Sequence, residues 1–291
     1  MTTPDKKYLF VINPGSGPDN RPWRNIIHNY FTEKNLTAEF FILDCPPDIE
    51  LLTQKIKESD INITVAVGGD GTVTMVAKIV GALNGTLGII PAGSANGMAR
   101  ELGIPLDPVA ALDSLLKGHV KKCDAIKINE KHICLHLCDI GINAQLIKYF
   151  DEGKVRGKFG YAKMIIKTLW YKKKLKVTIH SANRQIKREA FMVVLANASK
   201  YGTGAVINPK GQLDDGIFEI IIIRKLALSE LLKMLFRPGL FDPKKIEILS
   251  GTSVSMTTIH SAHFQVDGEY LGKIKALNGR ILSNYVNIIL P

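Results

Sequence analysis

Up to residue 123, short apolar runs alternate with amphipathic segments. The apolar runs predict buried strands over 8–12, 38–43, 63–67 and 86–93. The segments between them carry apolar residues at helical spacing and predict helices over 24–34, 48–59, 95–103 and 107–118. In the last of these, Asp107 is the expected N-cap and Gly118 the expected stop. The βαβα order predicts a mostly parallel sheet covered by helices on both faces.

Beyond residue 123 the pattern changes to strands separated by turn residues. Runs at 125–129, 131–141, 174–180, 185–198, 216–224, 253–258, 263–270 and 276–290 predict strands. Helices are predicted only over 161–173 and 228–236. We therefore expect an α/β protein of two domains, a parallel-sheet domain over 1–123 and a β-rich domain over 124–283.

Composition narrows the class of protein. The chain has 291 residues, of which 46% are hydrophobic and 22% charged, as in a well-packed protein of two domains. It contains no apolar run long enough for a membrane span and no secretory pattern at its start. Four cysteines, Cys45, Cys123, Cys134 and Cys138, do not form a disulfide framework, so we expect a cytoplasmic protein.

The formal net charge of +11 favours anionic partners, which are nucleotides, nucleic acids or anionic membrane surfaces. Charge alone does not choose among them. Aromatic residues make up only 7% of the chain, and no basic and aromatic module for nucleic acid is present. We therefore expect no nucleic-acid partner.

Three glycine-bearing turns follow predicted parallel strands, at 13–17, 68–72 and 92–97. Ligands of open parallel sheets bind at the carboxyl ends of strands. Glycine lets backbone N–H groups approach phosphate oxygens, and the N-terminus of a following helix attracts negative charge. The chain has neither a GxxxxGK[ST] segment nor a GxGxxG segment at its first strand. The three turns therefore indicate a phosphate site that is neither a P-loop nor a Rossmann dinucleotide site.

The central turn, Gly68-Gly69-Asp70-Gly71-Thr72, contains one carboxylate. A bare carboxylate repels a polyphosphate, so Asp70 fits a phosphate site if it holds a divalent cation, through water. The alternative is that Asp70 only caps a helix, as aspartate often does.

The segments VINPGSG, VAVGGDGTVTMVA, GIIPAGSANGMARELGIP, QLDDGIFEIII and VDGEY, in this order and spacing, resemble the diacylglycerol kinase catalytic domain family, and within it the soluble bacterial lipid kinases. The resemblance covers nearly the whole chain. GGDGT alone is not specific, because NAD kinases and phosphofructokinases carry similar turns. The resemblance implies a Rossmann-like first domain, a β-sandwich-like second domain, and a final strand, about 284–291, that returns to the first domain.

The resemblance also implies a function and its residues. The function is transfer of the γ-phosphate of ATP, with Mg²⁺, to a lipid hydroxyl. The first acceptor to expect is diacylglycerol or a related glycerolipid. Asp70 corresponds to the nucleotide and Mg²⁺ carboxylate and Glu269 to the general base. The nucleotide-binding positions are Asn13, Ser16, Gly69, Gly71, Thr72, Ser94 and Asn96. Asp214 and Asp215 correspond to a structural Mg²⁺ site, and Asp124 to an acidic position in a water and metal network.

The residues themselves leave alternatives open. Glu269 follows the turn dipeptide Asp267-Gly268, and the residues alone favour an exposed hairpin glutamate over a base. Family members commonly have an aspartate after the asparagine of the third turn, where this chain has Gly97. A kinase of a soluble acceptor, similar to NAD kinases, is one alternative function. A non-catalytic nucleotide-binding regulator, suggested by Gly97, is another.

Two further patterns bear on partners. One predicted strand carries alternating histidines and cysteines that are too far apart to bind one metal ion together: His132, Cys134, His136 and Cys138.

A second pattern is a basic face at helical spacing along and just beyond the predicted 161–173 helix, formed by Lys163, Lys167, Trp170 and Lys174. This face is either solvated or a surface for anionic lipids. From the lipid kinase resemblance we expect peripheral binding at the inner face of the membrane and a possible homodimer.

Overall fold

We describe a computed structural model of the chain over residues 6–17, 21–58, 61–151, 174–181, 184–201 and 205–291. It divides into two compact units. Unit 1 comprises Met1–Cys123 and Asn284–Pro291, and unit 2 comprises Asp124–Ser283. Each unit is described by itself.

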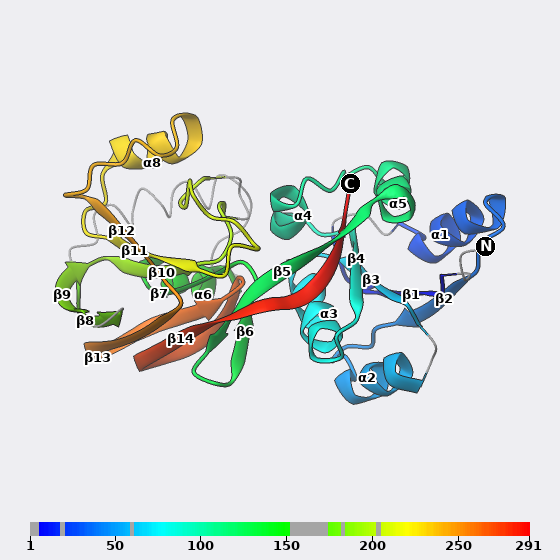
Figure 1. Cartoon of the computed structure of the whole chain (residues 1–291), viewed down its shortest axis with the longest axis horizontal. Helices are drawn as coiled ribbons and strands as arrows, with labels where there is room; N and C mark the ends of the chain where they lie inside the picture. The colour runs from blue at the N-terminus through cyan, green and yellow to red at the C-terminus, as the bar shows by residue number, and fades with distance from the viewer. Residues whose placement is uncertain (1–5, 18–20, 59–60, 152–173, 182–183, 202–204) are drawn as a thin grey trace. The chain divides into compact units, whose positions relative to one another are not determined.

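Unit 1 is built on a parallel sheet (Figure 1). Its strands lie in the order β2-β1-β3-β4, and the end of β14 pairs with β4 in parallel through Asn287 and Ile288. Their bounds are β1 Tyr8–Ile12, β2 Ala38–Ile42, β3 Ile63–Gly68, β4 Thr86–Pro91 and β14 Glu269–Leu290. Every residue of β1 and β3 is buried, as expected for strands covered on both faces.

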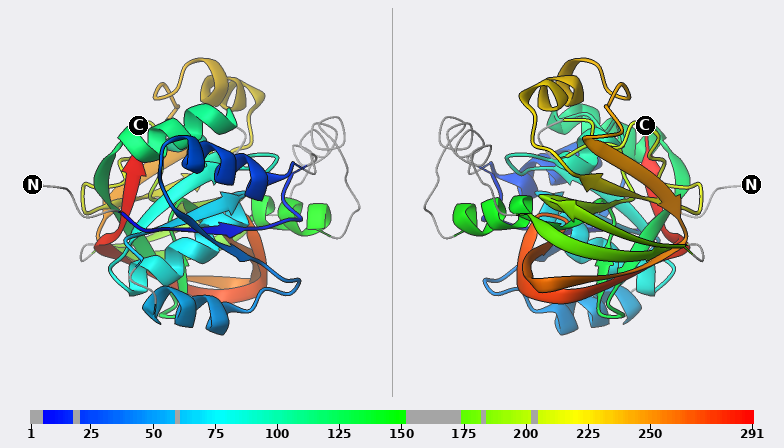
Figure 2. Two further views of the ribbon diagram at one scale, coloured as in Figure 1. Left: turned by 90° about the vertical axis from the view of Figure 1, so that its right-hand side faces the viewer. Right: turned by 90° about the vertical axis from the view of Figure 1, so that its left-hand side faces the viewer.

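Helices cover both faces of this sheet. They are α1 Trp23–Glu33, α2 Ile49–Glu58, α3 Asp70–Ala82, α4 Gly97–Glu101 and α5 Pro108–Lys117. Figures 1 and 2 show α1 and α5 on one face and α2 and α3 on the other. Phe10 on β1 packs in one apolar cluster with Phe31 of α1 and Leu112 of α5. Asp107 caps α5 by accepting from Ala110 N at 3.0 Å, which confirms the predicted cap.

The last residues of β14 are tied into unit 1 by packing as well as by pairing. Ile289 belongs to the cluster of Phe10 and Leu112. Tyr285 donates from its hydroxyl to Lys78 O at 3.1 Å. Its ring lies so close to Gly81 of α3 that a Cβ there would fall 2.4 Å from Tyr285 Cε1. The C-terminal strand is therefore an integral part of the first unit.

Unit 2 consists mainly of antiparallel strands, in the order β12-β11-β10-β7-β13-β14, with β8 and β9 continuing from β13 and β5 and β6 forming a further pair. The bounds are β5 His119–Ile128, β6 His132–Cys134, β7 Leu137–Gly141, β8 Leu175–Ser181, β9 Arg184–Ala190, β10 Met192–Ala196, β11 Phe218–Ile223, β12 Ile246–Gly251 and β13 Ser253–Val266. Two helices described in this unit are α6 Ile142–Asp151 and α8 Leu228–Phe236.

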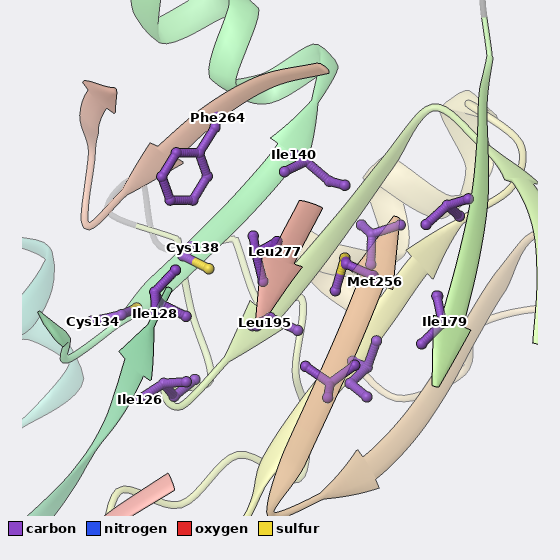
Figure 3. Close-up of a cluster of buried hydrophobic side chains, with 14 of the residues drawn as sticks. Ile126, Ile128, Cys134, Cys138, Ile140, Ile179, Leu195, Met256, Phe264 and Leu277 are labelled. Carbon is purple, nitrogen blue, oxygen red and sulfur yellow. The ribbon is translucent and has the colours of Figure 1, made fainter. Parts of the chain in front are cut away.

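Two apolar clusters hold unit 2 together. Figure 3 shows the larger one, where side chains from β5, β7, β10, β13 and β14 point toward one another, among them Leu195 and Phe264. Alternate residues of the same strands, such as Val194 on β10, pack in a second cluster with Ile142 of α6 and Met234 of α8. The period of two in side-chain direction explains why β10 serves both clusters.

The structure corrects some element boundaries. The run 131–141, predicted as one strand, is two strands, β6 and β7, because the backbone turns at Leu135 and His136. The run 185–198 is divided in the same way at Phe191 between β9 and β10. Helix α6 was not predicted, whereas α8 confirms the helix predicted over 228–236. The predicted helix 161–173 lies outside the described residues. No helix in the described part of the chain is long and apolar enough to cross a membrane.

Candidate functional site

The strand order of unit 1 has a topological switch point. The chain leaves β1 toward β2 on one side and leaves β3 toward β4 on the other. Ligands of open α/β sheets bind at the carboxyl ends of the strands at such a point. The turns after β1 and β3, together with the turn after β4, begin at this edge. These are the three glycine-bearing turns of the sequence.

The backbones of the three turns touch. A Cβ on Gly93 would fall 2.4 Å from Gly69 Cα, so a side chain at this position would separate the second and third turns. Gly17 has φ +79°, and a Cβ there would fall 2.3 Å from Ala92 O. Glycine is therefore required at these positions because the turns are in direct backbone contact.

Side chains from the turns reinforce these contacts. Asn13 donates from Nδ2 to Thr72 Oγ1 at 3.0 Å and accepts from Gly15 N at 3.0 Å. Ser16 Oγ accepts from Gly69 N at 3.4 Å. Asn96, with φ +52°, closes the third turn through Gly93 N at 2.9 Å and Gly93 O at 2.8 Å. The predicted nucleotide-binding residues thus hold the three turns together, whereas Ser94 lies exposed beside them.

The first turn of α3 is open to a ligand. No side chain caps this helix at Gly69. Gly71 is exposed, and apart from its chain neighbours and the backbone of its own helix no atom lies within 4 Å of the position that its Cβ would take. The leading N–H groups of a helix have no partner within the helix and carry a partial positive charge. The first turn of α3 is thus the predicted place for a phosphate group.

Asp70 is held by the third turn. Its Oδ2 accepts from Gly97 N at 3.0 Å and its Oδ1 from Met98 N at 2.9 Å. The carboxylate therefore caps α4, the capping role that the sequence left open, but on a helix 27 residues further along the chain. Each oxygen keeps a further lone pair for water or a cation.

Within the described ranges, no three His, Cys, Asp or Glu side chains lie close enough to hold a metal ion. A protein cage for Mg²⁺ therefore does not fit. Mg²⁺ that accompanies a nucleotide keeps several waters and takes one or two carboxylates, and Asp70 fits that mode. Gly97, whose N–H donates to Asp70 Oδ2, adds no second carboxylate beside Asp70.

Glu269 lies in unit 2 at the tip of the β13–β14 hairpin, opposite Val266. Asp267 and Gly268 form the turn with φ of +49° and +88°, the conformation of a type I′ hairpin. The Glu269 side chain is exposed, and no hydrogen bond or ion pair ties it to the described residues. Its carboxylate therefore faces solvent, as the predicted base role requires.

The neighbouring Asp267 fixes the tip. Its carboxylate accepts from three successive backbone N–H groups, Leu135 and His136 at 2.9 Å and Leu137 at 3.1 Å. The Asp267 N–H in turn donates to Leu137 O at 2.9 Å. These bonds explain why the chain turns between β6 and β7, and they attach the tip to that turn.

A buried polar chain supports the tip from inside. Gln265, 1% exposed, accepts from Gly268 N at 2.8 Å and donates to Asp139 Oδ2 at 2.6 Å. Asp139 is fully buried, and it also accepts from Asn143 Nδ2 at 2.7 Å and Ala144 N at 3.1 Å at the start of α6. Burial raises the pKa of Asp139 to about 6, against the lowering effect of these hydrogen bonds.

The remaining predicted acids meet at the loop before β11. Asp124, 2% exposed, accepts from Gly216 N at 2.7 Å through Oδ2, and its own N–H bonds to Leu213 O. Asp214 and Asp215 are exposed, and Asp215 Oδ1 accepts from Ile217 N at 3.1 Å. Asp124 thus shapes the loop that carries the two exposed acids.

Sequence reasoning missed Gln265 and Asp139, and it treated Asp267 only as a turn residue. The local pattern points the other way, since Gln265 alternates with Phe264 and Val266 in a strand, where a polar residue between apolar ones predicts an exposed position. Its burial depends on Asp139, 126 residues away. The pattern of the strand does not contain that partner.

Two protein-family models match successive parts of this chain. Residues 7–128 match the family described as diacylglycerol kinase catalytic domain, and residues 137–290 match the YegS C-terminal NAD kinase beta sandwich-like domain. A diacylglycerol kinase of Staphylococcus epidermidis is 28% identical over 252 residues, covering 84% of this chain and 79% of that protein. One of Staphylococcus saprophyticus is 27% identical over 242 residues, covering 80% and 78%.

The fold agrees as well. A crystal structure of a diacylglycerol kinase from Bacillus anthracis str. Sterne superposes with a TM-score of 0.74 at 20% identity, covering 99% of this chain and 97% of that one. This confirms the expected α/β class with a β-sandwich-like C-terminal domain. The second family spans more than half of the chain, and the first spans the turns described above. The chain therefore belongs to the diacylglycerol kinase family, with a catalytic domain followed by the YegS-type β-sandwich-like domain.

Proposed function

We propose that this protein is an ATP-dependent lipid kinase, a phosphotransferase that moves the γ-phosphate of ATP to the hydroxyl of diacylglycerol or a related glycerolipid. The observation that carries the proposal is the contact of three glycine turns around the open N-terminus of α3. The names of the staphylococcal relatives support the choice of acceptor.

The nucleotide phosphates would lie over the first turn of α3. Backbone N–H groups at Gly71 and Thr72 would donate to phosphate oxygens, with the helix dipole adding to the attraction. Asn13, Ser16 and Asn96 keep the turns in place through the hydrogen bonds described above. These residues bind and position the nucleotide.

Mg²⁺ bound with ATP would neutralise phosphate charge and polarise the γ-phosphoryl group, with Asp70 as its protein contact. Asp70 has a second task, since it holds the third turn through the N–H groups of Gly97 and Met98. We also propose that Asp214 and Asp215 bind a structural Mg²⁺, completed by water. Their exposure and their support by Asp124 are compatible with this role.

Glu269 would act as the general base. Its carboxylate takes the proton from the lipid hydroxyl while that oxygen bonds to the γ-phosphorus, and the bond to the β-phosphate oxygen breaks to release ADP. Asp267 and Gln265 do not touch the substrate in this scheme. They position Glu269 by fixing the turn that carries it.

The acceptor lies in a membrane, so we propose peripheral membrane binding. Leu232 and Phe236 of α8 and the following Leu240 are exposed to 47%, 76% and 65%. Apolar side chains exposed together in this way are typical of membrane or protein contacts. From the family resemblance we also propose a homodimer.

The test is transfer of labelled phosphate from ATP to a panel of glycerolipids and sphingoid bases in mixed micelles, with NAD and sugars as soluble acceptors. We expect transfer to a glycerolipid and a loss of about 10²–10⁴-fold in Glu269→Gln. Glu58→Gln, at an exposed glutamate of α2, is the control for a lost charge. Transfer to NAD but to no lipid would establish the soluble-acceptor alternative, and full activity of Glu269→Gln would remove the base assignment.

A further inference from the structure

A cavity of about 460 Å³ in unit 2 lies beside the hairpin that carries Glu269. Its wall is formed by the start of α6, the start of β8, and the β13–β14 hairpin around the irregularity between Thr257 and Ala262. None of the proposed nucleotide or metal residues lines it. The proposed transfer reaction leaves it without a role.

The lining of this cavity is cationic. Three lysines and two histidines contribute to it, namely Lys174, Lys176, Lys273, His260 and His263. Among the described residues that line it there is no aspartate or glutamate. The larger cavity of the same unit, about 630 Å³, differs in this respect, because it contains Glu130 paired with Arg280 at 2.7 Å.

Only a weak ion pair involves one of these lysines within the described residues. Glu189 Oε1 lies 3.9 Å from Lys176 Nζ, and both side chains are more than half exposed. An exposed pair at this distance interacts weakly. Lys273 has no carboxylate partner within the part of the chain described. Lys174 places its Nζ 5.6 Å from the centre of the Phe191 ring.

The pKa of His263 reflects the positive charges around it. Burial and the charges of Lys273 and Lys148 lower its pKa. Lys273 faces it across the hairpin, and Lys148 of α6 lies over the ring of Tyr270. The cavity thus gathers three exposed lysines around a half-buried histidine, and a cleft lined by one sign of charge attracts anions more strongly than a flat surface.

The N-terminus of α6 is not the attracting group. Its leading N–H groups at Ile142 and Ala144 already donate to Phe191 O and to Asp139. An anion in the cavity would therefore be held by side chains. Lysine ammonium groups suit phosphate, because they are compact charges with three donors each.

Part of the wall is apolar. Ile142 and Phe191 line the cavity, and Ile259 at its rim is 62% exposed. A small inorganic anion would leave these side chains without a contact. A ligand with a charged head and an apolar body would cover both kinds of surface.

We propose that this cavity binds the phosphate group of an anionic phospholipid, with Lys174, Lys273 and His260 at the phosphate and Ile259 against the apolar part. The choice of a lipid rests on the proposed function, because a lipid kinase works at a membrane and releases a lipid phosphate. The site is separate from the transfer reaction. A ligand there would be linked to the catalytic hairpin, because His263 Nδ1 and the Tyr270 hydroxyl are 2.8 Å apart and Tyr270 follows Glu269.

The test compares binding to phosphatidylcholine vesicles with and without phosphatidic acid. The variant Lys174→Gln/Lys273→Gln removes two charges from the cavity. Lys187→Gln/Lys210→Gln removes two charges from exposed positions of the same unit that do not line it. We expect the cavity variant to bind phosphatidic acid vesicles about tenfold more weakly and the control variant to bind like the wild type. Equal losses in both variants, or no loss in either, would overturn the proposal.

A second measurement separates a lipid from a soluble phosphate ester. The ring signals of His260 and His263 are followed by NMR during titration with phosphatidic acid micelles, glycerol 3-phosphate or inorganic phosphate. Shifts with micelles alone identify a lipid, shifts with all three identify a general phosphate site, and shifts with none overturn it. These assays require no turnover. The two failures are therefore distinguishable: absent phosphate transfer with intact micelle shifts would reject the kinase proposal, whereas intact transfer with no micelle shifts would reject the lipid site.

Discussion

Gln265 joins two distant parts of unit 2, since its amide donates to Asp139 Oδ2 at 2.6 Å and accepts from Gly268 N at 2.8 Å. Asp139 in turn caps the start of α6. The turn that presents Glu269 is therefore anchored to a buried carboxylate. These hydrogen bonds hold the backbone at Glu269 in place, although its side chain is exposed.

Replacing Gln265 with methionine tests the anchor. Gln265→Met preserves length but removes both hydrogen bonds, leaving Asp139 and Gly268 N without this partner. We expect a lower kcat with little change in the KM for ATP, and a loss of stability of about 1–3 kcal/mol. Asn143→Ala is the matched control, because it removes another donor to Asp139 without touching the turn. Equal kinetics of the two variants would show that the tether does not position Glu269.

Asp139 predicts a pH dependence of stability. Its pKa rises on folding from near 3.8 to about 6, so the folded protein holds a proton that the unfolded chain releases between these values. Above about pH 6 the buried carboxyl is ionised in the folded protein, and its desolvation lowers the stability by the full amount. Below about pH 4 the carboxyl is protonated in both states, and this loss of stability is absent. Relative to Asp139→Asn, the wild type should gain on the order of 3 kcal/mol between pH 7 and pH 4. Urea unfolding of both proteins across this range measures it, and a constant difference would contradict the burial effect.

Asp70 has two possible tasks, which substitutions separate. Asp70→Asn keeps an oxygen for one N–H of α4 but loses the charge that would face Mg²⁺, so we expect most phosphate transfer to be lost while the fold remains. Asp107→Ala removes the cap of α5 in the same unit and should cost about 1 kcal/mol of stability without changing kcat. Transfer assays and unfolding curves are compared for both. An active Asp70→Asn would make Asp70 a cap only.

Gly71 tests the phosphate position. A methyl group there meets no protein atom, so Gly71→Ala should fold normally and be up to about 1 kcal/mol more stable, because alanine favours helix. The methyl group would occupy space needed by a phosphate oxygen. Losing one charged hydrogen bond weakens ATP binding by about tenfold to a hundredfold. Calorimetry with ATP measures the affinity, and unchanged binding would place the phosphates elsewhere.

Gly97 stands at the position where the family resemblance leads us to expect an aspartate. In Gly97→Asp a second carboxylate would lie beside Asp70, since Gly97 N is 3.0 Å from Asp70 Oδ2. Like charges repel, so the variant should be less stable without Mg²⁺ and should regain stability with it. Thermal unfolding across Mg²⁺ concentrations measures this effect. Gly97→Asn is the uncharged control, and the same response in that variant would exclude a charge effect.

Sequence periodicity predicted the first unit well. Strands 8–12 and 63–67 and the Asp107 cap follow from local patterns, because a doubly covered parallel strand is apolar throughout and a capping aspartate acts within one turn. The three glycine turns were also found from sequence, since strand ends and glycines are local features. The sequence alone thus determined the class of fold and the residues of the turns.

The tertiary structure decided what those residues touch. Asp70 caps a helix that begins 27 residues later, and Gln265 is buried only because Asp139, 126 residues away, is placed opposite it. Strand 131–141 is broken because Asp267 takes the N–H groups of its middle residues. Local pattern determines which face of an element is apolar, whereas a polar partner far along the chain is supplied only when the strands pair. This is why the turns were predicted from sequence and the support of Glu269 was not.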